Sequence, residues 1–96
     1  MEFLFELETE NDPIVPCRLL NVLRRKGIRI NTFTMTAKDA KISIAAVFEL
    51  PEEGVEHIFN FLRRMEGVDR VSYRAAHSST ELAAGPAESS RRTTQL

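Results

Sequence analysis

The stretch Glu10-Asn11-Asp12-Pro13 decides how this chain is organised. Before it, Phe3, Phe5 and Leu7 are spaced two residues apart, which predicts a strand with one buried face. After it, apolar residues recur at helical spacing as far as Gly27, which is the expected end of the helix. The stretch is therefore predicted to be the turn between a first strand and a first helix.

The predicted first helix covers residues 14 to 27 and has clear start signals. Asp12 is a suitable N-cap, and Pro13 suits the first helical position. Its apolar stripe consists of Val15, Leu19, Val22 and Leu23. Cys17 is the one cysteine of the chain, so an intramolecular disulfide is excluded. We interpret this cysteine as a small packing residue of the helix.

A second strand is predicted over residues 28 to 36, and its apolar pattern changes phase. Ile28 and Ile30 have one parity, whereas Phe33 and Met35 have the other. A β-bulge, or burial of both faces, would explain the change. Residues 38 to 40 are polar and short enough for a hairpin connection to the next strand.

The remaining elements complete a β-α-β-β-α-β order. Residues 42 to 50 alternate as a strand, Pro51 and two acidic residues open a second helix, and Gly67 ends it before a last strand over residues 68 to 73. The predicted fold class is α+β, a ferredoxin-like four-stranded antiparallel sheet with two helices on one face. On the other face, cross-strand charge pairs are expected between Glu2 and Arg74 and between Glu6 and Arg70.

Composition limits the size of the domain and the class of partner. The chain has 96 residues, 43% hydrophobic and 28% charged, with a net charge of −1. Residues 1–75 are predicted to form the domain, and residues 76–96 a flexible polar tail. Such a small core favours an oligomer.

The charge balance argues against nucleic acid as a partner. No apolar run is long enough to span a membrane, so we expect a cytoplasmic protein.

Two other classes of function have little support in the residues. An RNA-binding domain with this element order displays aromatic side chains on its open face, but Phe3, Phe5 and Phe48 have the parity of the buried face. A small ferredoxin-like enzyme needs a reactive cluster, and neither His57 nor His77 lies near Cys17 in the sequence. His57 is expected on the polar side of the second helix. We therefore expect a protein that is not an enzyme and carries no metal or cofactor.

The turn and its helix resemble an ACT domain, a small βαββαβ regulatory module of amino-acid metabolism. The pattern is Asn11-x-Pro13, followed by a helix that ends Arg25-Lys26-Gly27-Ile28-x-Ile30. A closer resemblance is to the small regulatory subunit of acetolactate synthase (acetohydroxyacid synthase), isozyme II type. The similar residues are Pro13, Arg18-Leu19-Leu20, Val22-Leu23-Arg24, Gly27, Met35, Ile42-Ser43-Ile44, Phe59, Leu62 and Val68-Asp69-x-Val71.

This resemblance implies where an amino acid would bind. In such domains, amide groups at the start of the helix can hold the ligand carboxylate. The implied ligand-binding residues are Asn11, Asp12, Pro13, Ile14, Val15, Arg29 and Asn31. Ile14 stands where valine-responsive small subunits usually have glycine, and Arg29 where they often have asparagine. These departures resemble isozyme II, in which valine feedback is weak or absent.

The resemblance also implies partners. The leading hypothesis is a regulatory subunit that activates the large thiamine-diphosphate-dependent subunit of acetolactate synthase in branched-chain amino-acid biosynthesis. The alternative is a stand-alone dimeric sensor with an amino-acid effector, which a titration would reveal. For both, a homodimer is expected through sheet edges and the first helices, with Phe33 and Met35 on the apolar second-strand edge.

Overall fold

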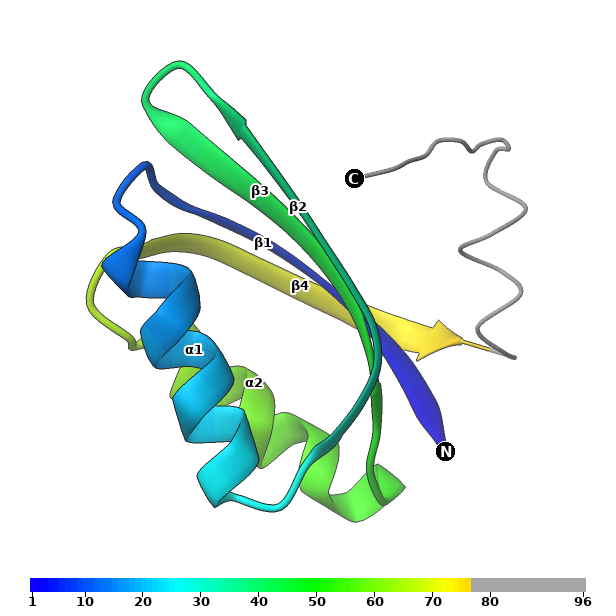
Figure 1. The fold of residues 1–96 in the computed structure, drawn as a ribbon. Coiled ribbons are helices and arrows are strands. Elements are labelled where there is room, and N and C mark those ends of the chain that lie inside the picture. Colours follow the sequence, from blue (N-terminus) through cyan, green and yellow to red (C-terminus); the bar gives the residue numbers. More distant parts are fainter. Residues whose placement is uncertain (77–96) are drawn as a thin grey trace.

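The computed structural model describes residues 1–76, and these have the predicted β-α-β-β-α-β order (Figure 1). The elements are β1 (Glu2–Glu10), α1 (Ile14–Arg25), β2 (Arg29–Lys38), β3 (Lys41–Glu49), the 3-10 turn η1 (Glu52–Gly54), α2 (Val55–Arg63) and β4 (Val68–Ala76). The predicted flexible tail lies outside the described residues, apart from Ala76 at the end of β4. None of the helices among residues 1–76 is long and apolar enough to cross a membrane.

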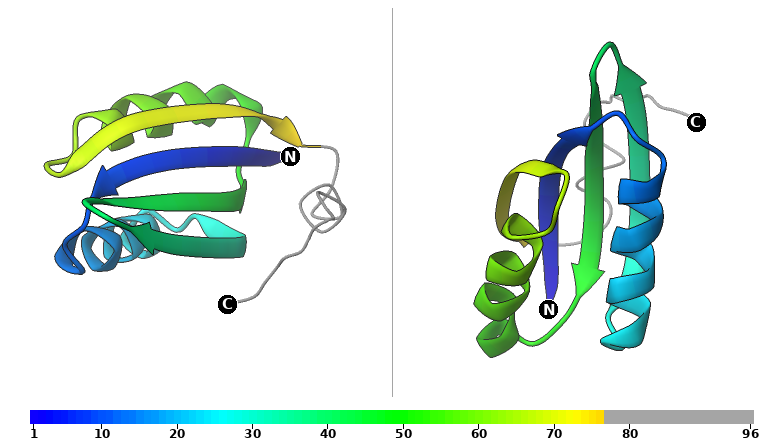
Figure 2. Two further views of the ribbon diagram at one scale, coloured as in Figure 1. Left: turned by 90° about the horizontal axis from the view of Figure 1, so that it is seen from above. Right: turned by 90° about the vertical axis from the view of Figure 1, so that its left-hand side faces the viewer.

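The four strands form one antiparallel sheet in the order β2-β3-β1-β4. Both helices cover the same face of this sheet (Figure 2). This is the ferredoxin-like arrangement that the sequence predicts. Since β2 and β4 are the outer strands, each leaves one row of backbone groups without a partner strand within the described residues.

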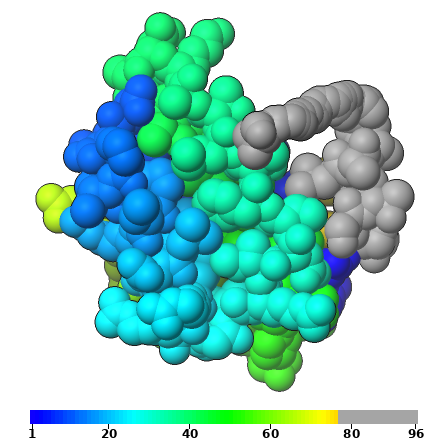
Figure 3. Space-filling view, in the orientation of Figure 1, coloured from blue at the N-terminus to red at the C-terminus, as the bar shows by residue number. Residues whose placement is uncertain are grey.

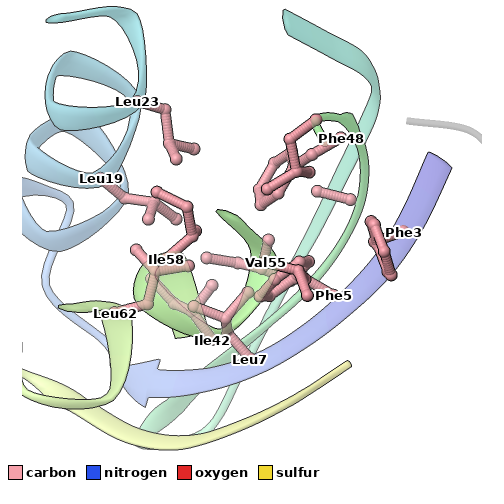
Figure 4. Packing of buried hydrophobic residues seen from close by; sticks show 13 residues of the cluster. Phe3, Phe5, Leu7, Leu19, Leu23, Ile42, Phe48, Val55, Ile58 and Leu62 are labelled. Atoms are coloured by element: carbon pink, nitrogen blue, oxygen red, sulfur yellow. The ribbon is translucent and has the colours of Figure 1, made fainter. Parts of the chain in front are cut away.

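The main core lies between the sheet and the two helices, where side chains from α1, α2 and the strands converge (Figure 4). Phe5 and Phe48 are fully buried with their ring centroids 5.0 Å apart, and Tyr73 stacks on Phe5 at 5.3 Å. Leu19 and Leu23 of α1 are also fully buried. The inward-facing side chains of the strands therefore pack against the apolar stripe of α1, as predicted.

A bulge in β2 explains the change of phase in its apolar pattern. Ile30 pairs with Phe48 and Thr32 pairs with Val47, so Asn31 is an extra residue on this strand. The extra residue turns Phe33 to the same face as Ile30, where both pack against the core. The bulge alternative of the sequence prediction is therefore confirmed.

The predicted register between β1 and β4 is wrong by two residues. Arg74 lies opposite Leu4, and Arg70 lies opposite Glu8. Glu6 is opposite Ser72 instead. The expected residues do share the helix-free face, because a shift of two residues preserves the alternation of side chains.

Both ends of α1 have the geometry that the sequence predicts. Pro13 has helical dihedral angles, and the Asp12 carboxylate accepts a hydrogen bond from the Ile14 N–H at 3.1 Å, as an N-cap does. At the other end Gly27 has φ +75°, and the Ile28 N–H donates to the Leu23 carbonyl at 3.0 Å. This six-to-one bond is the closure of a Schellman motif.

Candidate functional site

The β1–α1 turn is held between two loops that are distant in sequence. The Glu10 N–H donates to the Gly67 carbonyl at 2.9 Å, in the connection between α2 and β4. The Asn11 N–H donates to the Ala40 carbonyl at 3.0 Å, at the tip of the β2–β3 hairpin. Both partners are loop carbonyls, so local sequence around the turn could not have identified them.

The side chain of Asn11 is also bonded to the hairpin. Its Nδ2 donates to the Asp39 carbonyl at 2.8 Å. Asp39 has φ +57°, in the left-handed region, and with Ala40 it forms a two-residue turn between Lys38 and Lys41. The polar residue expected to meet a ligand thus has a structural partner.

The backbone N–H groups around the helix start are occupied as well. Beyond the two bonds to the loops, they run from Asp12 to the Glu10 carbonyl (2.9 Å), from Ile14 to the Asp12 carboxylate (3.1 Å), from Val15 to the Asp12 carbonyl (3.0 Å) and from Cys17 to the Pro13 carbonyl (3.4 Å). Pro13 and Pro16 have no N–H to offer. Every backbone donor from Glu10 to Cys17 therefore has an acceptor within the protein. A ligand carboxylate would have to displace one of these bonds.

Ile14 stands at the mouth of this turn. Ile14 is 51% exposed, the highest value after Met1 among the large apolar residues that the structure describes. Val15, the next residue, is instead buried in the core side of α1. The branched side chain that the sequence places where glycine is usual is therefore presented to solvent.

Arg29 and Asn31 lie far from the turn within one chain. Arg29 pairs with Glu49, and the Asn31 Nδ2 donates to the Glu2 carboxylate at 2.6 Å. Glu2 and Glu10 are the two ends of β1, and eight strand residues span roughly 26 Å. The predicted ligand residues thus form two groups, residues 11–15 and residues 29–31, at opposite ends of the sheet.

A salt bridge braces the turn end of the sheet on its helix-free face. Lys41 pairs with Glu10 across β3 and β1, and its ammonium bonds to the carboxylate of Asp69 in β4. This hydrogen bond raises the pKa of Lys41 above the ordinary lysine value, with smaller contributions from the charges of Glu8 and Glu10. The brace thus crosses β1 and links its two neighbouring strands.

Two apolar residues are exposed near the outer edge formed by α1 and β2. Leu20 on α1 is 39% exposed and Met35 on β2 is 41% exposed. The surfaces of the two elements adjoin on one side of the molecule, as the blue-to-cyan and teal regions of Figure 3 show. The strand order confirms that β2 is an edge strand, as the predicted dimer requires. The predicted dimer surface did not include Leu20, although its position off the apolar stripe of α1 is visible in the sequence.

The residues considered for catalysis lie apart on the surface. Cys17 is exposed, so its interpretation as a packing residue is wrong; it lies on the outer side of α1, and Pro16 next to it is buried instead. His57 is exposed on α2, as predicted. Within residues 1–76, no three His, Cys, Asp or Glu side chains are grouped so that they could hold a metal ion.

The helix-free face carries an open hollow of about 620 Å³, lined by charged, hydroxyl and apolar residues. One cross-strand row through it contains Thr36, Ser43, Glu8 and Arg70, and the next row begins at Thr34. The aromatic side chains of β1 and β3 lie on the opposite face, under the helices. Bases could not stack on them without unfolding the core.

No protein-family model matches this sequence. No curated protein matches it either. Solved structures do match, at low sequence identity. The ACT domain from the GTP pyrophosphokinase of Chlorobium tepidum is 17% identical, with a TM-score of 0.67 over 77% of this chain and 97% of that chain.

Two further matches have similar scores. An ACT domain protein from Streptococcus pneumoniae is 14% identical, with a TM-score of 0.62 over 88% of this chain and 91% of that one. The C-terminal domain of the MgtC protein from Mycobacterium tuberculosis is 15% identical, with a TM-score of 0.61 over 78% and 86% of the two chains. Together with the strand order and the two helices on one face, these matches show that the chain has the ferredoxin-like fold of ACT domains.

Proposed function

We propose that this protein is a non-catalytic regulatory subunit that binds and activates the large thiamine-diphosphate-dependent subunit of acetolactate synthase. The ACT fold supports a regulatory role, and the resemblance of the β1–α1 turn and α1 to the isozyme II small subunit supports this enzyme. Thiamine diphosphate belongs to the large subunit in this proposal. The chain itself contributes protein contacts.

The occupied turn is the observation that carries this proposal. An ACT domain that senses an amino acid needs donors for the ligand carboxylate, and helix-start amides are the usual source. Here the donors from Glu10 to Cys17 are bonded to the protein, and Ile14 is exposed at the turn. An exposed isoleucine on a turn without spare donors suits contact with another protein better than capture of a zwitterion. We therefore expect that valine inhibits the complex weakly or not at all.

The working form in this proposal is a homodimer that joins β2 edges and the adjacent flanks of α1. β2 is an outer strand, so its unpaired backbone groups can pair with those of a second copy. Leu20 and Met35 would lose their exposed apolar surface in the same contact. A dimer would also add buried area to a core that comes from only 76 described residues.

Co-expression with the large subunit tests the proposal. An affinity tag on the large subunit should retain this chain, and the complex should have higher synthase activity than the large subunit alone. Ile14→Lys should weaken retention, whereas Glu53→Lys on η1, at the other end of the sheet, is the control. If the chain is not retained and activity does not rise, the proposal is wrong. Saturable binding of an amino acid to the isolated chain would instead favour the stand-alone sensor.

A further inference from the structure

Asn11 makes two hydrogen bonds to the tip of the β2–β3 hairpin. Its backbone N–H donates to Ala40 at 3.0 Å, and its side-chain amide donates to Asp39 at 2.8 Å. The side-chain bond joins residues 28 positions apart in the sequence. It therefore connects the start of α1 with the far end of the edge strand β2.

Apart from Asn11, the salt bridge of Lys41 with Asp69 holds the hairpin at its base. All residues from 34 to 41 are exposed, and the tip projects beyond the helices (Figure 1). Asp39 at its turn has φ +57°, a conformation that L-residues other than glycine adopt at a cost. The Asn11 amide binds the carbonyl of this same residue, so it orients the peptide group of the strained turn.

We propose that Asn11 is a positioning residue that latches the hairpin tip and thereby keeps the free edge of β2 ordered for pairing with a second copy. The pairing step rests on the dimer of the proposed function. The latch has a regulatory consequence. A partner that engages the β1–α1 turn and draws the Asn11 amide away from Asp39 would loosen the edge strand, and dimerisation and partner binding would then influence each other.

Replacement of Asn11 tests the latch. Asn11→Ala removes the side-chain donor, and Asn11→Asp keeps the size of the side chain but offers a carboxylate that cannot donate to the Asp39 carbonyl. Asn21→Ala is the matched control, because Asn21 is exposed on α1 and, within residues 1–76, its side chain bonds only to Arg24, at 3.5 Å. Amide hydrogen exchange over residues 34–43 and the dimer dissociation constant from sedimentation are the readouts.

Both Asn11 variants should exchange their hairpin amides about two- to tenfold faster than the wild type, as expected for one lost neutral hydrogen bond. The dimer dissociation constant should rise by a similar factor, and Asn21→Ala should match the wild type. Wild-type exchange rates in both Asn11 variants would overturn the latch. Faster exchange with an unchanged dissociation constant would overturn its effect on the edge. A monomeric wild type would contradict the proposed dimer, and the exchange rates would still decide the latch.

Discussion

Gly67 lies against Val15 so closely that a Cβ atom at position 67 would stand 2.7 Å from the Val15 Cγ2. Glu10 is also within reach, with its Oε2 3.2 Å from the same point. Gly67 has φ +92° and accepts the hydrogen bond of the Glu10 N–H. The loop between α2 and β4 thus depends on glycine for its conformation and for its approach to the turn.

Alanine substitutions at the three described glycines separate the cost of the left-handed backbone from the cost of the close contact. Gly67→Ala should lower the free energy of unfolding by roughly 2–4 kcal/mol, from left-handed strain and overpacking together. Gly27→Ala has φ +75° but no atom within 4 Å of its Cβ, so about 1–2 kcal/mol is expected. Gly54→Ala, with ordinary φ and its nearest contact at 3.7 Å, should be nearly neutral. Urea unfolding measures all three, and equal losses at positions 27 and 67 would contradict the close contact.

Replacement of Ile14 with glycine tests whether bulk alone closes the turn. The side chain would be gone, but the backbone donors from residue 10 to residue 17 would keep their acceptors. We therefore expect no calorimetric binding of L-valine by Ile14→Gly at millimolar concentration. Binding with a stoichiometry near one per chain would show that steric obstruction by Ile14 is the main barrier.

Alkaline titration tests the brace between Lys41 and Asp69. Because the folded state raises the Lys41 pKa, this contribution to stability is present below the ordinary lysine value and is lost as pH rises through the raised value. Asp69→Asn should shift the Lys41 pKa back toward its ordinary value, as followed by NMR of the side-chain Cε and Hε signals. Glu53→Gln, on η1, is the control. A Lys41 pKa that is equal in wild type and Asp69→Asn would exclude the brace in solution.

A charge on the β2 edge should weaken the dimer. Met35→Glu would place a carboxylate in the proposed interface, and the dissociation constant should rise at least about tenfold, which is 1.4 kcal/mol. Phe61→Glu is the matched control, because Phe61 is 36% exposed on α2 and lies beneath Lys26, which would pair with the new charge. Sedimentation equilibrium compares the two. A stronger effect of Phe61→Glu would move the interface to α2.

The sequence predicted the local structure well because its signals act over a few residues. The phase change between Ile30 and Phe33 indicated the bulge that the structure places at Asn31. Asp12 and Gly27 marked the ends of α1 through capping, which is also local. These features depend on residue spacing and on local backbone preferences, and both can be read from the sequence.

Other features depend on tertiary contacts that spacing does not reveal. The β1–β4 register was wrong because either register puts the charged residues on one face. The extra residue Asp69 in β4 accompanies a phase change between Val68 and Val71, but that change does not decide which residues of β1 lie opposite Arg70 and Arg74. The occupation of the turn depends on the Gly67 and Ala40 carbonyls, which come from distant loops. The separation of Arg29 from the turn follows from the length of β1 and the position of β2 at the edge.

The most direct test of the central claim, that the turn has no donors to spare for an amino acid, is a two-dimensional NMR titration of the wild-type chain with L-valine. The amide signals of Ile14, Val15 and Cys17 report the three donors at the helix start. We predict that none of them shifts in a saturable way up to millimolar valine. Saturable shifts at these amides would contradict the account, because they would show that a ligand carboxylate displaces the internal acceptors.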